Sequence, residues 1–408
     1  MNQHKVERGI NFNNSIALFV ALIINAAGHA YFTITFPALG RELQLEDINS
    51  SLILSLPALL MIISAPLWGW LCEKWGRRRV MIIGLVTAAI SSAVLAVVIN
   101  DTFLFMFNLQ SLFMLLLVIR CIHTLLSSGI QPAAQATIAD LTTKKGRAFG
   151  MGLMGASFGI GTILGALLAV LSGSEFLVAG FLFLSGLLAI VSITLLSFFK
   201  ETARATTTVK PRALDFKKLW VLLFTTLVGL AVYSALQQIT SWRLQDDFQM
   251  VSDASVRFTG AIMMSTMLTM VVTQALMVRW LAFSPQTLRI LGAFIVAISL
   301  LLAALVPSAI LLLISMCGLG LGLGVLMPGN LALLSITVSP LQQGQIAGIN
   351  GMCQGLGLAL GPVMGSILYQ SNTSLPYLVA SAALGIIALQ AWWEAKRNQV
   401  NSDNYLRF

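Results

Sequence analysis

Long apolar runs recur along almost the whole chain and are separated by short polar segments. An α-helix rises about 1.5 Å per residue, so about twenty apolar residues cross a hydrocarbon layer of about 30 Å. A helix also satisfies its backbone hydrogen bonds internally, as a lipid environment requires. The pattern predicts an all-α membrane protein with twelve transmembrane helices, near residues 15–37, 50–72, 80–99, 109–138, 146–171, 176–199, 218–241, 257–280, 287–306, 309–337, 345–369 and 375–394.

The positive charge of the chain follows the predicted membrane topology. The 408 residues are 57% hydrophobic and 10% charged, with a net charge of +9. If the N-terminus is cytoplasmic, most of the 24 Lys and Arg residues fall on cytoplasmic segments or the span ends beside them, Arg41, Arg243 and Arg257 lie outside, and Arg120 alone is embedded, away from the ends of its span. This asymmetry is the positive-inside rule. We therefore expect a multi-pass protein of a bacterial-type inner membrane, surrounded by lipid, with both termini cytoplasmic and no nucleic-acid partner.

The chain has the pattern of a duplicated six-helix bundle. A polar, basic segment at residues 200–217 separates residues 1–199 from residues 218–408, and we interpret it as a cytoplasmic linker between two bundles. Residues of the two halves match at one constant spacing without a gap: Pro132 with Pro328, Gly152 with Gly348, Gly155 with Gly351, Gly159 with Gly355, Gly161 with Gly357 and Gly165 with Gly361. An even number of spans in each half predicts parallel repeats with a solute path between them. We expect the protein to act as a monomer.

Three motifs carry a resemblance to a known family. They are GWLCEKWGRRRV at residues 69–80, the stretch from Arg120 to the IAD that ends at Asp140, and GTILGALLAV from Gly161 with its copy GLALGPVMGS from Gly357. In these motifs the chain resembles the major facilitator superfamily, in its drug:proton antiporter branch of tetracycline and multidrug efflux proteins. It departs from that pattern at Glu73, where aspartate is usual, at His123 and Thr124 after the arginine, and at Ala166 in place of proline.

The resemblance implies roles for two groups of residues. The first group latches the cytoplasmic ends of the two halves in one conformation: Gly69, Glu73, Gly76, Arg77, Arg78, Arg79 and Asp140. The second forms a helix-packing motif: Gly161, Gly165, Gly357, Gly361 and Pro362. For the first group, ordinary positive-inside charge remains an alternative, although a glycine such as Gly69 permits close helix approach and Glu73 is near enough in sequence to pair with the arginines.

Arg120 is the candidate on which the functional interpretation depends. A cation in hydrocarbon costs at least about 2.5–3.5 kcal/mol, so its side chain should face a cavity and find acceptors. No Asp or Glu falls inside any predicted span, away from its ends. Two readings stay open: Arg120 braces helices through carbonyls, Asn25 or glutamines, or it attracts a carboxylate of the solute. Polar residues at helical spacing extend the proposed substrate site: Arg120, Asn25, His29, His123, Thr124, Gln131, Tyr233, Gln237, Asn330, Asn350 and Gln354.

His29 and His123 are the candidates for proton coupling, because no carboxylate lies in the interior of a predicted span. A bound anion would make their protonation easier, which favours carrying proton and anion together over strict exchange. Export driven by the potential is a further alternative, worth about 2.3 kcal/mol per charge per 100 mV.

Other patterns are assigned to structure. The run GLGLGLG at residues 318–324 follows no strand, so we expect close helix packing through Gly320 and Gly324 and no nucleotide loop. Cys72, Cys121, Cys317 and Cys353 stand singly, so we expect free thiols, no disulfide and no metal site.

The sequence thus predicts a secondary transporter that exports a small amphiphilic, carboxylate-bearing solute, such as a siderophore-like metabolite, by alternating access. A broad-specificity multidrug:proton antiporter is the alternative. A membrane-embedded enzyme is the rival from another class, but it would need clustered catalytic groups, and the chain offers neither a carboxylate pair nor metal-ligand spacing. We expect no catalytic residues and no cofactor.

Overall fold

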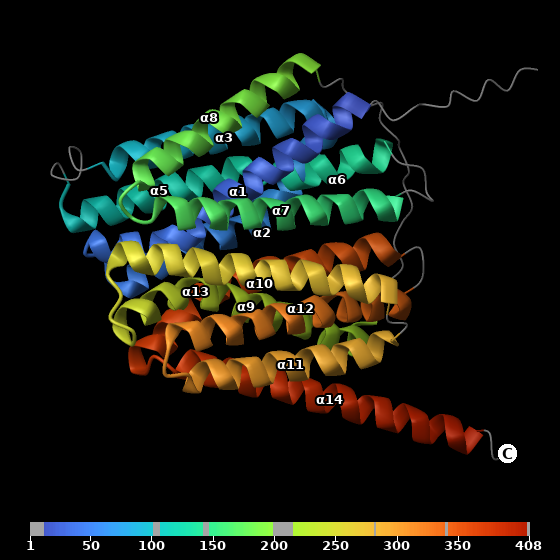
Figure 1. Ribbon diagram of the computed structural model, residues 1–408. Helices are drawn as coiled ribbons and strands as arrows, with labels where there is room; N and C mark the ends of the chain where they lie inside the picture. Colours follow the sequence, from blue (N-terminus) through green and yellow to red (C-terminus); the bar gives the residue numbers. More distant parts are fainter. Residues whose placement is uncertain are drawn as a thin grey trace, which may run out of the picture. The chain divides into compact units, whose positions relative to one another are not determined.

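The computed structural model describes residues 12–100, 107–141, 147–198, 215–280, 283–338 and 342–405. Twelve helices within these residues are long and apolar enough to cross a membrane, as predicted, and the described part contains no strand. The helices of Figure 1 are α1 (Phe12–Glu42), α2 (Asp47–Trp75), α3 (Arg77–Val98), α5 (Leu109–Ser127), α6 (Ile130–Leu141), α7 (Arg147–Ser172), α8 (Leu177–Phe198), α9 (Phe216–Asp246), α10 (Ser252–Trp280), α11 (Pro285–Leu305), α12 (Ala309–Thr337), α13 (Gln343–Ser371) and α14 (Leu375–Tyr405). Most of the predicted linker, residues 200–214, lies outside the described residues.

The fourth span differs from the prediction because it consists of two helices, α5 and α6, interrupted at Ser128 and Gly129. Pro132 accounts for the interruption. A proline ring clashes with the carbonyl four residues earlier, here that of Ser128, whereas a proline in the first turn of a new helix costs no hydrogen bond. Gly129 is required at the break, because an added Cβ would lie 2.6 Å from Val80 and 3.0 Å from the ring of Trp68.

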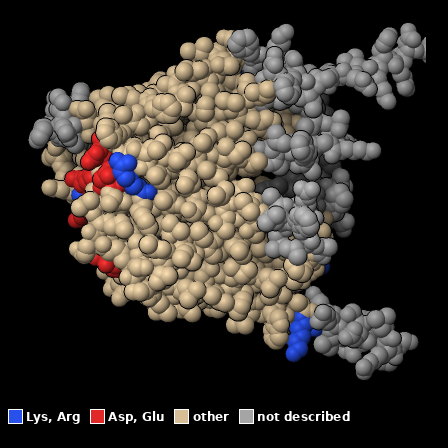
Figure 2. Space-filling model, viewed as in Figure 1, with Lys and Arg blue, Asp and Glu red and all other residues tan. Residues whose placement is uncertain are grey.

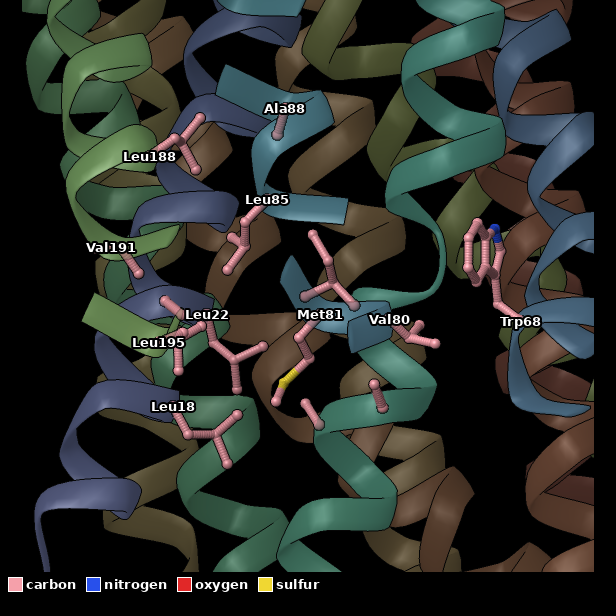
Figure 3. Close-up of a cluster of buried hydrophobic side chains, with 14 of the residues drawn as sticks. Leu18, Leu22, Trp68, Val80, Met81, Leu85, Ala88, Leu188, Val191 and Leu195 are labelled. Atoms are coloured by element: carbon pink, nitrogen blue, oxygen red, sulfur yellow. The ribbon is translucent and has the colours of Figure 1, made fainter. Parts of the chain in front are cut away.

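The helices form two compact units, which are described separately. The first unit contains residues 1–32, 60–165 and 176–207. In it α3 contacts α5, α6 and α8. Its core is a cluster of buried apolar side chains from α1, α3, α6 and α8, among them Leu22, Leu85, Ile130 and Leu188. Figure 3 shows Leu22, Leu85 and Leu188 in this cluster, with Trp68 of α2 at its edge. On the face shown in Figure 2, residues other than Lys, Arg, Asp and Glu form a broad band, as expected of a surface in contact with lipid.

The second unit contains residues 33–59, 166–175 and 208–408, and so includes one end each of α1, α2 and α7. The ends of α1 and α2 are attached to α9 by buried side chains. The indole of Trp242 is 0% exposed and donates to the carbonyl of Pro37 over 3.0 Å. Gln238 donates to the Ser51 hydroxyl over 2.7 Å. Each hydrogen bond contributes about 0.5–1.5 kcal/mol, so this attachment is held by several modest contacts in addition to the burial of a large ring.

The glycine motifs of the two halves make equivalent contacts with neighbouring helices. On α7, a Cβ added at Gly161 would lie 2.3 Å from the carbonyl oxygen of Ile23 on α1. On α13, a Cβ added at Gly357 would lie 2.5 Å from the carbonyl oxygen of Leu227 on α9. Gly165 and Gly361 repeat the same close approach one turn later, and Pro362 follows within α13. The fifth span of each repeat therefore packs on the first through backbone contact.

The GLGLGLG run lies within α12 and packs on both of its neighbours. An added Cβ at Gly320 would lie 2.1 Å from the carbonyl oxygen of Thr266, and one at Gly324 would lie 2.8 Å from that of Met270, both on α10. Gly322 is equally close to Val296 of α11. The expected close packing is confirmed.

Arg120 is not the only buried arginine among the described residues. Arg243, predicted to lie outside the membrane, is 2% exposed near the end of α9, and Arg289 is 1% exposed in α11. Arg243 is satisfied there because it pairs with Asp247 at 3.0 Å and donates to the carbonyls of Ala303 and Ala304, at the end of α11. Helix ends leave carbonyls without intrahelical donors, and a guanidinium is suited to bind several of them.

Candidate functional site

Arg120 lies in α5, within the first unit, and is 5% exposed. The carbon at the centre of its guanidinium lies 3.7 Å from the ring centroid of Phe32 on α1. Its Nε has no hydrogen-bond partner among the described residues. A guanidinium over an aromatic face gains about 2 kcal/mol or more when it is desolvated, but a buried N–H without an acceptor remains unfavourable. Arg120 is therefore only partly satisfied by its surroundings.

Helices α1, α3, α5 and α8 bring several predicted site residues together around Arg120. Asn25, His29, Ser91 and His123 line a cavity with it. The cavity holds about 10 Å³, which is room for about one water molecule. The Nδ1 atom of His123 is buried and has no hydrogen-bond partner in the part of the chain that the structure describes. The hydroxyl of Ser91 likewise has no partner among the described residues, so three groups in this small space have unused hydrogen-bonding capacity.

The chemistry of this cavity suits an anionic or electron-rich group. Its lining residues include one permanent cation and no Asp or Glu. Phe32 and Phe181 add apolar faces, with ring centroids 6.4 Å apart. A cation beside aromatic rings and neutral polar groups has the chemistry to bind the polar end of an amphiphilic molecule. In this conformation the cavity has room for about one water molecule, so a solute requires a wider conformation.

Two further candidates of the first unit lie away from this cavity. Thr124 is half-buried on α5, and Gln131 is exposed on α6, beyond the break in the fourth span. Neither is among the residues that line the cavity around Arg120. Their predicted contact with substrate stays a prediction.

The candidates of the second unit mainly bind one another or neighbouring helices. Asn330, 1% exposed on α12, donates to the Thr226 hydroxyl over 3.0 Å and to the Leu222 carbonyl over 2.8 Å. The Thr226 hydroxyl in turn donates to Asn350 of α13 over 2.8 Å. These bonds join α9, α12 and α13. Gln237 donates to the Thr33 hydroxyl over 3.0 Å.

Tyr233 is half-buried on α9, and Gln354 is exposed on α13. The structure does not connect either residue to the asparagine network by a hydrogen bond between described residues. Their assignment to the substrate site stays a prediction.

The predicted latch is described only in part. The side chains of Glu73 and Asp140 lie outside the described residues. Gly76 has φ +95° and forms the turn between α2 and α3, a conformation that favours glycine. Arg78 donates to the carbonyls of Leu195 and Leu196 near the end of α8. Arg77 is half-buried and Arg79 is exposed.

Gly69 does not make the close helix approach that we expected. An added Cβ would meet no atom within 4 Å among the described residues. The residue is half-buried on α2. In this conformation, its small size is therefore not required by packing.

A charged cluster that the sequence pattern did not indicate lies at the ends of α1 and α9, in the second unit. Arg41 pairs with Asp47 at 2.9 Å and with Asp246 at 2.8 Å, and lies over the ring of Trp242. The hydroxyl of Tyr369 donates to Asp246 over 2.8 Å. Asp47 is six residues from Arg41, so this pair was visible as a nearby opposite charge, whereas Asp246 and Tyr369 are far away in sequence.

No group of three His, Cys, Asp or Glu side chains within the described ranges is placed to hold a metal ion. Cys72, Cys121, Cys317 and Cys353 are free thiols in the structure.

The sequence and the fold of the chain are similar to those of known transporters. The sequence model of the Major Facilitator Superfamily matches residues 18–282 and 222–404. "Multidrug resistance protein 2" of Bacillus subtilis (strain 168) is 23% identical, with 97% of this chain and 99% of that protein covered. "Tetracycline resistance protein, class B" of Escherichia coli is 27% identical, with 90% of each chain covered.

Solved structures agree in fold. A bacterial homologue of the human lysosomal transporter Spinster, in an inward-facing and occupied conformation, matches with a TM-score of 0.72 at 16% identity, over 94% of this chain and 96% of that one. A mutant of the peptide transporter POT in complex with sulfate matches with a TM-score of 0.75 at 12% identity, over 94% of each chain. At these identities the similarity concerns the fold alone.

Proposed function

The chain belongs to the Major Facilitator Superfamily, and on that premise we propose that it exports amphiphilic organic compounds of more than one structure, as a multidrug exporter. The observation that carries this proposal is the full-length similarity to multidrug resistance proteins, which extends over 97% of the chain in one case. The two six-helix repeats, residues 1–199 and 218–408, would alternate access to a solute between them.

This proposal revises the substrate that we expected from the sequence. The relatives reported above are named multidrug and tetracycline resistance proteins. Of the two functions considered, the broad-specificity exporter therefore has the better support. A siderophore-like solute has no support beyond the charge of Arg120, and we do not retain it as the main substrate.

Arg120 is proposed to select for negative or electron-rich groups among these compounds. Its support is local: a guanidinium that is 5% exposed, an Nε without a partner among described residues, and a lining without carboxylates. His29 and His123 adjoin the same cavity and are the proposed proton carriers. A bound anion would stabilise an imidazolium beside it, which couples proton and solute at one site.

The proposed orientation has both termini in the cytoplasm of a bacterial-type cell, in agreement with the positive-inside distribution of Lys and Arg. In this orientation, Gly69, Glu73, Gly76, the three arginines that follow and Asp140 lie on the cytoplasmic side. We propose that they stabilise one conformation of the transport cycle.

The test is transport by purified protein in proteoliposomes, measured with anionic, neutral and cationic fluorescent compounds. Arg120→Gln should abolish transport of the anionic compounds and reduce that of neutral ones less, while Arg120→Lys, which keeps the charge, should retain part of it. Cys121→Ser is the matched control, because its side chain is on the same helix and outside the cavity lining. A folded Arg120→Gln protein that transports every anionic compound at the normal rate would refute the role of Arg120.

The driving force is tested separately in the same vesicles. Collapsing the pH gradient with nigericin while the potential is held should change the rate of transport if protons are coupled to it. Exchange of a proton for the solute should slow, and outward carriage of a proton together with an anion should accelerate. Transport that continues at an unchanged rate under these conditions and stops when the potential is removed would contradict a role of the histidines in coupling.

A further inference from the structure

The second unit contains a cavity that the proposed transport site does not use. It lies among α9, α11, α12 and α14, close to the residues where α9 and α11 begin, and has a volume of about 570 Å³. Its lining is basic: Lys217, Lys218, Arg289 and Arg397 face one carboxylate, that of Glu394. The cavity is therefore large enough for a polar headgroup and carries an excess of positive charge.

Arg289 is the buried anchor of this cavity. Its side chain is 1% exposed, and one terminal nitrogen donates to Glu394 over 3.1 Å. Its Nε and second terminal nitrogen, Nη2, are buried and have no hydrogen-bond partner among the described residues. A guanidinium presents five N–H donors, so a single carboxylate oxygen leaves most of them unused. Arg243, equally buried in the same unit, is instead satisfied by Asp247 and two carbonyls.

Two helix N-termini add to the positive potential. Helix α9 begins at Phe216 and places Lys217 and Lys218 in its first turn, and α11 begins at Pro285 and places Gln286 there. All three of these polar side chains line the cavity. The N-terminus of a helix carries about half a positive charge, which favours an anion beside it. Asp215, the N-cap of α9, pairs with Lys218 at 3.6 Å and accepts from the Lys217 N–H, but it does not line the cavity.

The position of the cavity relative to the membrane points to the source of that anion. Trp220 and Trp393 line it and are 56% and 60% exposed. Exposed tryptophans at the ends of transmembrane helices lie at the level of lipid headgroups. The Arg397 guanidinium lies 5.9 Å from the centroid of Trp393, and Figure 2 shows basic side chains gathered near this end of α14. The charged groups are thus placed where headgroup phosphates lie.

We propose that this cavity binds the phosphate group of an anionic phospholipid, with Arg289 as the buried ligand and Lys217, Lys218 and Arg397 as the outer ones. The phosphate oxygens accept the N–H groups that Arg289 leaves unused, while Gln286 and the first turns of α9 and α11 contribute further donors. The acyl chains extend along the exposed apolar surface beside Trp220 and Trp393. In the proposed topology the site is cytoplasmic, but its chemistry does not depend on the transported solute.

The test counts lipids retained by the purified full-length protein in native mass spectrometry, with dioleoylphosphatidylglycerol as the probe and dioleoylphosphatidylcholine as the uncharged comparison. Arg397→Gln should weaken phosphatidylglycerol binding by about fivefold, the contribution of one basic side chain near a membrane surface. Lys396→Gln is the matched control, because Lys396 is equally exposed and stacks on Trp392 in the same manner but does not line the cavity. It should leave binding unchanged.

Glu394→Gln supplies a second and opposite readout. It removes the carboxylate that competes for Arg289, so it should strengthen phosphatidylglycerol binding, whereas a merely structural ion pair would leave binding unchanged. Arg289→Gln, which removes the buried ligand, should abolish the specific retention of phosphatidylglycerol. Glu394→Gln keeps the proposal testable if Arg289→Gln fails to fold.

Three results would overturn the proposal. Equal effects of Arg397→Gln and Lys396→Gln would show a general surface attraction. Equal retention of phosphatidylcholine and phosphatidylglycerol would exclude recognition of the negative charge. Protection against thermal unfolding by inorganic phosphate alone, lost in Arg397→Gln, with no specific retention of phosphatidylglycerol, would assign the cavity to a soluble phosphate compound and exclude the lipid.

Discussion

The close contact between α7 and α1 leads to a prediction about Gly161→Ala. The new Cβ would lie 2.3 Å from the carbonyl oxygen of Ile23 and 2.6 Å from the Cβ of Ala26. Ordinary van der Waals contacts are about 3.5–4.0 Å, so the two helices would have to separate locally by more than about 1 Å. Because the nearest atom is backbone, no side-chain rotation can relieve the clash. Overpacking of this kind costs about 1–3 kcal/mol.

Gly155→Ala is the matched control on the same helix. Its Cβ would meet no atom within 4 Å among the described residues. Both substitutions gain helix propensity, about 0.8–1.0 kcal/mol for glycine to alanine. The propensity gain cancels in the comparison, so Gly161→Ala should be less stable than Gly155→Ala by about 1–3 kcal/mol, the full overpacking cost.

The measurement is equilibrium unfolding of the purified protein in mixed micelles with an increasing SDS fraction, followed by tryptophan fluorescence. Gly155→Ala should unfold at the same SDS fraction as the parent protein or a higher one, and Gly161→Ala at a lower one. If Gly161→Ala were as stable as Gly155→Ala, the backbone contact between α1 and α7 would not limit the size of this side chain, and the packing argument would fail.

Three further predictions concern the second unit. Gly357→Ala should be less stable than Gly351→Ala in the same unfolding assay, because the first Cβ meets α9 and the second meets no described atom; equal stabilities would deny the equivalence of the two glycine motifs. Asp246→Asn should weaken its half-exposed ion pair with the arginine of α1 by about 0.5–1 kcal/mol, which should accelerate hydrogen–deuterium exchange at the end of α1; unchanged exchange would mean that the pair does not hold this end. Thr226→Val should lower the free energy of unfolding by about 1–3 kcal/mol, because it leaves two buried asparagine amides without their shared partner. Thr225→Val should lower it less, because the Thr225 hydroxyl bonds only a carbonyl of its own helix. The opposite order of stability in SDS unfolding would refute the bridging role of Thr226.

The twelve spans were predictable from the pattern of residues. A chain crosses the hydrocarbon layer only with a run of apolar residues of sufficient length. Within that layer the backbone polar groups must bond one another, as they do in a helix, so the positions of the spans are local properties of the chain. The helix contacts at Gly161 and Gly357 were predictable for a related reason: only glycine permits backbones to approach so closely, and its regular spacing marks the face on which a neighbour packs. The presence of Asn25, His29 and His123 in the cavity around Arg120 was also predictable, because helical spacing places these residues on facing stripes of two helices.

Pairing between distant residues was not predictable in this way. Arg243 was predicted to lie outside the membrane, and its burial became clear only when the carbonyls at the end of α11 were seen beside it. Asn330 and Asn350 resembled substrate ligands in the sequence, yet both bind Thr226. A buried polar group is stable wherever a partner satisfies it, and the partner is chosen by which helices become neighbours in space. Hydropathy cannot supply that choice, because the same polar residue has the same local pattern whether it faces a solute, a lipid headgroup or another helix.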